Sequence, residues 1–187
     1  MTYHDTKTYP EDRVRQGDIF EQVPYIDSYV EFEGKFELVI YDFPYTFVLT
    51  QDCDLLQNRN ERIKNAEIKK KDKFLFSIIV APLYNAEHLF SGNHLEFLDI
   101  ETELINSDNK KKIKQNNNPR YHFINFGDNV ALPDAVIDFK HYFSISLNWL
   151  ESNSHKRICS IMPIYREYIS QRFANYLSRI GLPSGIV

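Results

Sequence analysis

Apolar residues along the chain gather in short runs of strand length, separated by polar and turn-forming residues. The two strongest runs are Tyr45–Thr50, which follows Pro44, and Phe74–Pro82. Their β-branched and aromatic side chains predict central, buried strands. A hairpin turn is predicted at Gly34 and Lys35. Further strands are predicted at Gln16–Phe20, Phe32–Ile40, Tyr121–Ile124, Val136–Phe139 and Tyr142–Ile145.

The periodicity changes near the C-terminal end, where apolar residues recur at helical spacing. The pattern predicts an amphipathic helix over residues 160–181, with Ser160 as its N-cap and Pro163 in its first turn. Apolar positions are sparse at Gln57–Lys73, although Leu55, Leu56 and Ile63 would anchor a short helix there. The lysine- and asparagine-rich segment 106–118 predicts a loop. The residues expected to face the core from the C-terminal helix are Tyr165, Ile169, Phe173, Tyr176, Leu177 and Ile180.

Several strands followed by one terminal helix indicate an α+β fold that is mainly β. We expect a small twisted β-barrel with inserted loops or short helices, closed by the C-terminal helix. A chain of 187 residues is long enough to bury its own core, so residues 1–187 are expected to form one domain. Within it we expect a loosely held arm at 1–14, the barrel at 15–159 and the helix at 160–181.

Composition and charge narrow the class of protein. A hydrophobic content of 43% excludes a disordered chain. Cys53 and Cys159 lie far apart and form no ligand pair for a metal, which favours a reducing cytoplasm. We see neither an export signal nor a run of about 18 apolar residues, so no membrane association is expected. Residues 1–54 carry 12 acidic and 4 basic side chains, whereas residues 55–187 carry 14 acidic and 18 basic ones. A local basic face is therefore compatible with the net charge of −4.

Five segments precede the predicted C-terminal helix in a fixed order: Gln16–Phe20, Tyr45–Thr50, Ile78–Leu83, Leu132–Asp138 and Ser144–Leu150. In that order they resemble the strands of the MazF/PemK family of toxin ribonucleases, and the closing helix resembles the family's last helix. The resemblance implies an SH3-like barrel in a prokaryotic toxin–antitoxin or phage-defence system. It also implies a homodimer.

The same resemblance indicates where the family's active site would lie. In the family, an Arg precedes the proline of the second strand and a Thr or Ser follows the third, and these two side chains carry out the acid/base and phosphate-stabilising work. The matching positions here hold Phe43 and Tyr84. A phenyl ring cannot stabilise the charge that develops on a phosphorane, so ribonuclease activity of the family's kind is not expected.

The segment Thr50–Asp54 places a thiol between two carboxylates at the end of a predicted strand. One hypothesis makes Cys53 a nucleophile with His122 as its base, and a nearby cation is then needed because Asp52 and Asp54 disfavour a thiolate. The alternative is a small buried thiol at a strand end. Other candidates for the base and the cation are His88, Arg59 and Arg120.

A second hypothesis for this segment is a divalent cation held by Asp52 and Asp54. Residues two apart in an extended segment share a face, and Asp99 or Glu101 would supply further oxygen ligands. Cys53 would then point away, so the metal and thiol hypotheses compete. The simpler interpretation is that the two carboxylates cap a turn.

Basic and aromatic residues follow in the segment that leads to Tyr121. Arg120 and Tyr121, with His122, would contact a phosphate and stack a base, as in sites for single-stranded nucleic acid. The alternative is an exposed, solubilising loop. On the terminal helix, Arg172 and Arg179 share a face; one hypothesis is that it binds a partner or an anion, and the simpler interpretation is a solvated face. The lysines expected to strengthen nucleic-acid binding are Lys110, Lys111, Lys112 and Lys114.

These observations favour a MazF/PemK-like protein that contacts RNA or DNA, or a nucleic-acid-handling protein partner from the same locus. The candidate residues Thr50–Asp54, Tyr84, Arg120 and His122 are expected around one mouth of the barrel. Two alternatives stay open: an enzyme centred on Cys53 or on an Asp52/Asp54 metal site, and an interaction subunit with no catalytic site. No cofactor is expected.

Overall fold

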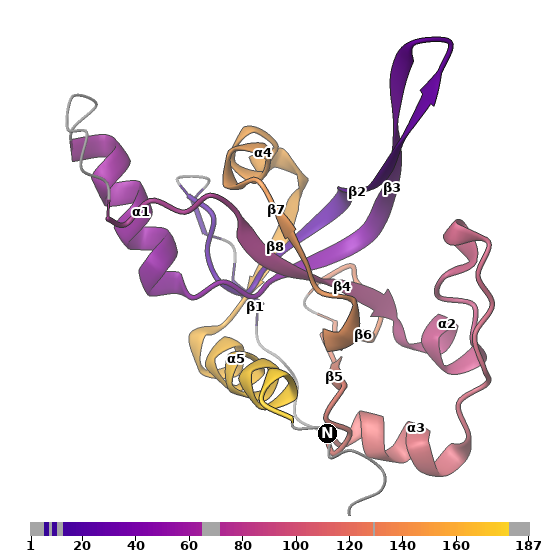
Figure 1. Cartoon of the computed structure of the whole chain (residues 1–187). Helices are drawn as coiled ribbons and strands as arrows, with labels where there is room; N and C mark the ends of the chain where they lie inside the picture. Colours follow the sequence, from indigo (N-terminus) through magenta and orange to yellow (C-terminus); the bar gives the residue numbers. More distant parts are fainter. Residues whose placement is uncertain (1–5, 8, 11–12, 65–71, 129, 180–187) are drawn as a thin grey trace, which may run out of the picture.

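The protein has an α+β architecture that is mainly β, as predicted, with an eight-stranded antiparallel sheet at its centre (Figure 1). The computed structural model describes residues 6–7, 9–10, 13–64, 72–128 and 130–179. The strands are β1 (Thr6–Lys7), β2 (Asp18–Phe32), β3 (Lys35–Val48), β4 (Ile78–Asn85), β5 (Tyr121–Ile124), β6 (Ala135–Asp138), β7 (Phe143–Ile145) and β8 (Arg157–Ile161). The helices are α1 (Asp52–Lys64), α2 (Ala86–Ser91), α3 (Ser107–Lys114), α4 (Leu147–Ser152) and α5 (Pro163–Leu177), with short 3₁₀ turns η1 (Glu96–Leu98), η2 (Phe139–His141) and η3 (Ser154–Lys156).

The sheet is open, and it does not close into the barrel that the sequence predicts. Its order is β1-β8-β2-β3-β4-β6-β5, with β7 paired to β4. No pairing among the described strands joins β1, at one end of this path, to β5 at the other. Strand β4 pairs with β3 along one edge and, along its other edge, first with β7 and then with β6. Strand β6 in turn pairs with β5, which is the last strand of the path.

The main core lies between the sheet and α5. The predicted strand after Pro44 supplies buried Phe47 and Leu49, and the predicted apolar stripe of the terminal helix supplies buried Ile169 and Phe173. The prediction of the stripe is therefore confirmed at these positions, whereas Leu177 is exposed and Ile180 lies outside the described residues.

Strand β8 replaces the predicted start of the terminal helix. The sequence predicts Ser160 as the N-cap, but Ser160 lies in β8 and pairs with Asp18 of β2, and α5 begins at Pro163. Close approach of α5 to the start of β2 depends on Gly17. Its φ is +85°, and a Cβ there would lie 3.2 Å from Cβ of Arg166 and 3.3 Å from the carbonyl oxygen of Ile161.

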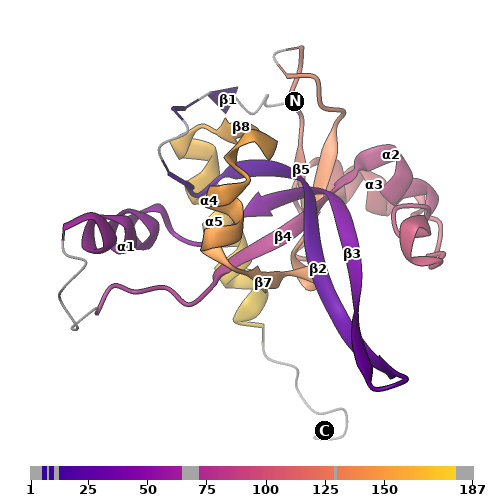
Figure 2. The same cartoon turned by 90° about the horizontal axis from the view of Figure 1, so that it is seen from above.

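Strands β2 and β3 form a hairpin much longer than the predicted one. They pair from Ile19 and Phe47 to Phe32 and Lys35, and the distal half projects beyond the body (Figures 1 and 2). The turn lies one residue earlier than predicted, at Glu33-Gly34, whose φ values are +51° and +72°. Two central residues with positive φ match the twist of a two-residue hairpin, and glycine adopts such angles without strain.

Helices are present both in segment 57–73, where the sequence leaves a short helix open, and in segment 106–118, which it predicts as a loop. Helix α1 covers the first part of the 57–73 segment because Asp52 and Asp54 favour its first turn and Leu55 is buried, although most of its surface is exposed. Helix α3 occupies most of segment 106–118 because the Asn106 side chain accepts a hydrogen bond from the Asn109 amide, and Ile113 is buried. Residues 65–71 lie outside the described part.

The start of the chain is attached to the body where the structure describes it. Strand β1, within the expected arm at 1–14, pairs with β8, and Val14 is buried. Residues 1–5, 8 and 11–12 of that arm lie outside the described residues. Among the described segments, none of the helices combines the length and the apolar character that crossing a membrane requires.

Candidate functional site

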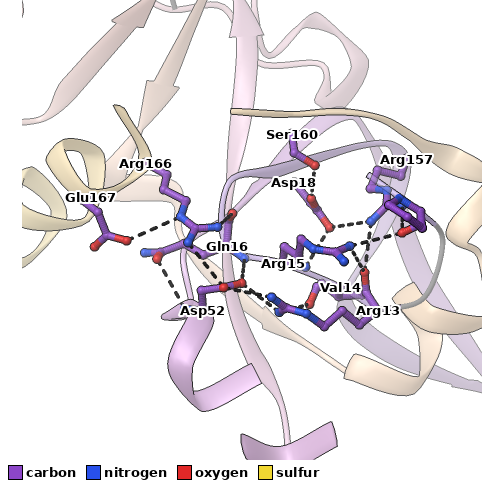
Figure 3. Close-up of polar contacts among 11 residues, drawn as sticks. Arg13, Val14, Arg15, Gln16, Asp18, Asp52, Arg157, Ser160, Arg166 and Glu167 are labelled. Atoms are coloured by element: carbon purple, nitrogen blue, oxygen red, sulfur yellow. Dashed lines mark hydrogen bonds and ion pairs between the residues drawn. The ribbon is translucent and has the colours of Figure 1, made fainter. Parts of the chain in front are cut away.

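Polar side chains gather in two separate clusters. We call the first the Asp138 cluster, and it lies where β4, β5 and η2 meet. The second, the Asp52 cluster, lies where the chain enters β2 and where α1 and α5 begin (Figure 3). The Asp138 cluster contains Tyr84, His94, Arg120, Asp138 and His141, and the Asp52 cluster contains Arg13, Gln16, Asp52 and Arg166.

The centre of the Asp138 cluster is a buried carboxylate at the end of β6. The Asp138 side chain is 0% exposed and accepts two hydrogen bonds from Arg120, from Nε at 2.8 Å and from Nη2 at 2.5 Å. It also accepts a bond of 2.9 Å from the backbone N–H of Lys140, and His141 Nδ1 lies 3.4 Å away. Such bidentate geometry is the strong form of an ion pair and fixes the guanidinium plane.

Two imidazoles and a phenol extend this cluster. His141 Nδ1 lies 3.0 Å from the Tyr84 hydroxyl, and the His94 ring packs edge-on against the Tyr84 ring at 4.7 Å. Burial lowers the pKa of His94 to about 4, against the opposing effect of Asp138. Burial also lowers the pKa of His141 and raises that of Tyr84. At neutral pH, His94 is therefore uncharged and Tyr84 keeps its proton.

A cavity of about 470 Å³ opens beside the Asp138 cluster. His94 belongs to its wall and is only 8% exposed, and neither ring nitrogen has a hydrogen-bond partner among the described residues. A buried polar group without a partner is costly, so the His94 ring is a strong candidate for contact with a ligand or water. The polar side chains along the cavity offer amide, cationic and aromatic groups: Asn106, Asn109, Asn118, Arg120, Tyr121 and Lys140.

Titration of His94 is expected to make the protein less stable in acid. Its pKa is about 4 when folded, below the ordinary 6.5, so the unfolded chain binds the proton more readily. The contribution of neutral His94 is complete above pH 6.5 and is lost as the pH falls toward 4, by about 3 kcal/mol. Urea denaturation of wild type and of His94→Phe at pH 7 and pH 4 measures this. The variant should lose less stability over that interval, and equal losses in both proteins would contradict the assignment.

The Asp52 cluster ties three parts of the chain together. Arg13 donates to both carboxylate oxygens of Asp52, at 2.8 and 2.9 Å, and Arg166 of α5 donates to Oδ2 at 3.4 Å. Gln16 accepts from the Asp52 amide and donates to the carbonyl of Leu49. Burial alone would raise the pKa of Asp52, but bonding to Arg13 and the charges of both arginines hold it below its usual value.

A second buried carboxylate, Asp18, lies beside this cluster. It accepts hydrogen bonds from the Ser160 hydroxyl, from the Arg15 amide at 2.8 Å and from Arg157 Nη1 at 3.2 Å (Figure 3). Burial raises the pKa of Asp18 in spite of these bonds. A cavity of about 380 Å³ nearby has four arginines in its wall, together with apolar residues and Glu151. These arginines are Arg13, Arg59, Arg62 and Arg157.

The structure does not bring Cys53 and His122 together. Cys53 is exposed near the start of α1, and its sulfur lies 3.6 Å from Gln51 Oε1 and 3.7 Å from Asp54 Oδ1. The buried-thiol alternative is therefore wrong. His122 is buried in β5, 5.7 Å from the ring of Tyr168, and β5 lies away from α1 in both views (Figures 1 and 2). The expected common mouth is thus divided between the two clusters.

The Asp52/Asp54 metal hypothesis also finds no geometric support. Both carboxylate oxygens of Asp52 are engaged by guanidinium groups, whereas Asp54 is exposed. Within the part of the chain that the structure describes, no three or more His, Cys, Asp or Glu side chains are grouped so that they could hold a metal ion.

The predicted nucleic-acid-binding residues do lie near one another, on α3 and at the start of β5. Lys110 and Lys114 lie over the ring of Phe90, at 5.5 and 5.4 Å, and Lys111 and Lys112 are exposed. The guanidinium of Arg120 lies 4.7 Å from the ring of Tyr121, and both residues contribute to the cavity wall. Asn106, Asn109 and Ile113 place one side of α3 along that cavity.

Two arginines of α5 bind the protein itself, although the sequence predicts a solvated face for Arg172. Arg166 contacts Asp52, and Arg172 donates to the backbone carbonyls of Asn116, Asn118 and Tyr121. Arg172 therefore fixes the segment between α3 and β5, which positions Arg120. Arg179, whose guanidinium lies 4.1 Å from the ring of Tyr176, fits the predicted exposed face.

The two positions that the MazF/PemK resemblance marks as catalytic lie in one apolar cluster. Phe43 is buried and stacks on Phe143 at 5.3 Å, and Tyr84 belongs to the same cluster. Sequence reasoning missed His94, Asp138 and His141, which lie beside Tyr84 in space. No spacing motif connects these residues along the chain, and only the fold reveals their proximity.

Comparison of the chain with protein-family models and with curated proteins finds no match. Function is therefore inferred from the two clusters and their surroundings.

Proposed function

We propose that the protein binds single-stranded nucleic acid along α3 and in the cavity beside the Asp138 cluster. The observation that carries this proposal is the cavity wall, where Arg120, Tyr121 and Lys140 accompany His94, a buried imidazole whose two nitrogens have no hydrogen-bond partner among the described residues. A phosphodiester with an attached base needs cations, hydrogen-bonding groups and an aromatic face within a few ångströms of one another.

Each part of the surface has a separate role in this proposal. Lys111 and Lys112, which are exposed on α3, attract the phosphate backbone. Tyr121 offers a half-buried ring for stacking, and the amides of Asn106 and Asn109 reach base edges. Only the two asparagines contact base edges in this proposal, whereas the cations contact phosphates. We therefore expect binding affinity to depend more strongly on salt concentration than on nucleotide sequence.

The likeness to MazF/PemK proteins supports a prokaryotic toxin–antitoxin or phage-defence setting as part of the same proposal. This part of the proposal rests on the order of the apolar segments along the sequence. Ribonuclease chemistry of the family's kind is not part of the proposal, since Phe43 has no polar side-chain atom and the Tyr84 hydroxyl is bonded to His141. The cytoplasm is the proposed location, because Cys53 and Cys159 are both free thiols.

Reversing two charges on α3 is expected to weaken binding about 10-fold or more. The double variant Lys111→Glu/Lys112→Glu removes two cations that attract phosphates and adds two charges that repel them. The slope of log K against log salt concentration should become shallower by about 0.7 for each of the two lysines. Fluorescence anisotropy with labelled RNA and DNA of about 16 nucleotides, at several salt concentrations, measures both quantities. Lys140→Glu, in the wall of the cavity, should weaken binding about 3-fold.

The matched control is Lys35→Glu/Lys73→Glu, which changes net charge equally at exposed lysines away from α3. It should bind within about 2-fold of wild type, because long-range charge is screened within about 10 Å. Equal weakening by both double variants would show non-specific attraction, and unchanged binding in the α3 variant would refute the proposed surface.

A further inference from the structure

The distal half of the β2–β3 hairpin exposes large apolar side chains that nothing in the described chain covers. We call residues 25–42 the β2–β3 arm. An isolated two-stranded hairpin is marginally stable in water, so an arm of this length with bare apolar side chains is an unusual feature for a monomer. The exposed apolar residues of the arm are Ile26, Tyr29, Val30, Phe32, Phe36, Leu38 and Ile40, between 48 and 69% exposed.

Strand register assigns most of these side chains to one face. Residues directly opposite each other in an antiparallel pair point to the same side of the sheet, and the side alternates along each strand. The pairs Tyr29↔Leu38 and Glu31↔Phe36 therefore share one face. The pair Ile26↔Ile40 lies on the same face, because the bulge at Asp27 adds one residue to β2 that has no partner in β3. Five of the six residues in these pairs are apolar, and the rings of Tyr29 and Phe36 meet edge-on at 5.9 Å. We call this the apolar face of the arm.

The opposite face of the arm is different. Its pairs are Ser28↔Val39, Val30↔Glu37 and Phe32↔Lys35, so each pair contains a polar residue. Nearer the body, Tyr25 continues this second face and packs against Phe43 and Phe143. The second face is therefore mixed and partly covered by the protein itself, and only the apolar face calls for a partner.

We propose that the apolar face of the arm is the contact surface between two copies of this chain. Five side chains of this size, half to two-thirds exposed, leave on the order of 600 Å² uncovered per copy. Face-to-face packing of two arms would cover about 1,200 Å² in total, which reaches the lower limit for specific protein interfaces. A surface made of one apolar stripe is also complementary to itself, as a two-fold symmetric contact requires.

Charge at the tip of the arm determines how the two copies are oriented. Glu31, Glu33 and Glu37 surround the turn, with Lys35 as the single cation. Two arms that pointed the same way would bring six carboxylates together, whereas arms that point in opposite directions keep the two tips apart. In the opposed orientation the two-fold axis passes near the Tyr29↔Leu38 pair, so Leu38 of one copy faces Leu38 of the other.

Sedimentation of the full chain tests the dimer. Wild type at about 50 µM should sediment at twice the monomer mass, and Leu38→Glu should sediment as a monomer because it buries a charge at the symmetry axis. The matched control is Val30→Glu, a similar change on the mixed face of the same arm, which should remain dimeric. A monomeric wild type at about 200 µM overturns the proposal, and so does dissociation by Val30→Glu alone.

Cross-linking tests the orientation without relying on a disruptive variant. In a Cys53→Ser background, the only native thiol left is Cys159, which is buried. Leu38→Cys should then be linked to Leu38→Cys of the second copy by a short bis-maleimide, because a spacer can bridge the roughly 10 Å between two sheets packed face to face. Glu33→Cys at the tip and Val30→Cys on the mixed face should not cross-link. Equal cross-linking at all three positions, or at the tip alone, overturns the opposed arrangement.

Discussion

Replacing Arg120 with alanine is expected to lower the free energy of unfolding by about 3–5 kcal/mol, because it leaves the Asp138 carboxylate buried without a cation. The carboxylate would keep only the Lys140 amide and the neighbouring His141 as partners. The Asp138 side chain is 0% exposed when Arg120 is present, so in the native protein the guanidinium, and not solvent, stabilises this carboxylate. Urea denaturation at pH 7 measures the loss of stability.

Two controls separate this effect from loss of charge in general. The double variant Arg120→Met/Asp138→Leu removes both ions and keeps the volume, so it should be much closer to wild type than Arg120→Ala. Lys111→Ala, at an exposed lysine of α3, should change stability by less than about 0.5 kcal/mol. A loss below about 1 kcal/mol for Arg120→Ala would show that the carboxylate gains another partner or a proton.

The central strands are predictable because burial on both faces leaves a direct signal in the sequence. Phe47 and Leu49 come from one unbroken apolar run and lie in the main core. The second run behaves differently: β4 begins at Ile78, and Phe76, which the pattern places within the buried strand, is 91% exposed. Apolar runs locate a strand well but fix its ends poorly, since an aromatic residue in an adjoining turn has the same hydrophobicity.

Helix α3 escapes prediction, and α1 is only weakly indicated, for a common physical reason. Each buries very few residues, so neither shows a clear apolar period. Helix α3 depends on its Asn106 cap, and α1 depends on the acidic residues of its first turn and on contacts with remote residues. The Asp52 carboxylate illustrates this, because its partners Arg13 and Arg166 lie 39 and 114 positions away. Such pairings cannot be inferred from local pattern.

The site is less predictable than the fold. The chemistry of Arg120 and Tyr121 makes them candidates from the sequence, and the structure does place them at a cavity beside α3. Their neighbour Asp138 is not predictable, because a lone aspartate at a strand end has no distinguishing sequence pattern. The same holds for His94, whose unusual feature is burial without a hydrogen-bond partner among the described residues, which only packing creates.

The sequence predicts neither the open sheet nor the full length of β2 and β3. These two strands continue past the body as a paired arm (Figure 1). The sequence signal for the arm is present in Phe32–Ile40, but it predicts only a short hairpin. Because an alternating apolar pattern does not distinguish a strand that packs on the core from one that projects, the exposure of Phe36 and Leu38 becomes evident only in the structure.

Replacing Asp52 with alanine is expected to lower the free energy of unfolding by about 3 kcal/mol, the second large effect we predict. Arg13 and Arg166 are 11 and 13% exposed, and both would lose their contact with Asp52, whereas Arg166 would keep its ion pair with Glu167. The start of α1 would also lose a favourable negative charge. Urea denaturation of Asp52→Ala measures the effect, and Asp54→Ala, its exposed neighbour, is the matched control with an expected loss below about 1 kcal/mol.

The same pair of variants decides between a structural and a metal-binding role for this segment. A ligand that binds the folded state preferentially raises the melting temperature. If Asp52 and Asp54 held a divalent cation together, Mg²⁺ or Mn²⁺ would raise the melting temperature of wild type, and either variant would abolish that rise. In the structure, the Asp52 carboxylate is already neutralised by two guanidinium groups, so a divalent cation would have to displace them. We therefore expect millimolar Mg²⁺ to leave the melting temperature of wild type unchanged. A metal-dependent rise that both variants remove would instead assign the segment to metal binding.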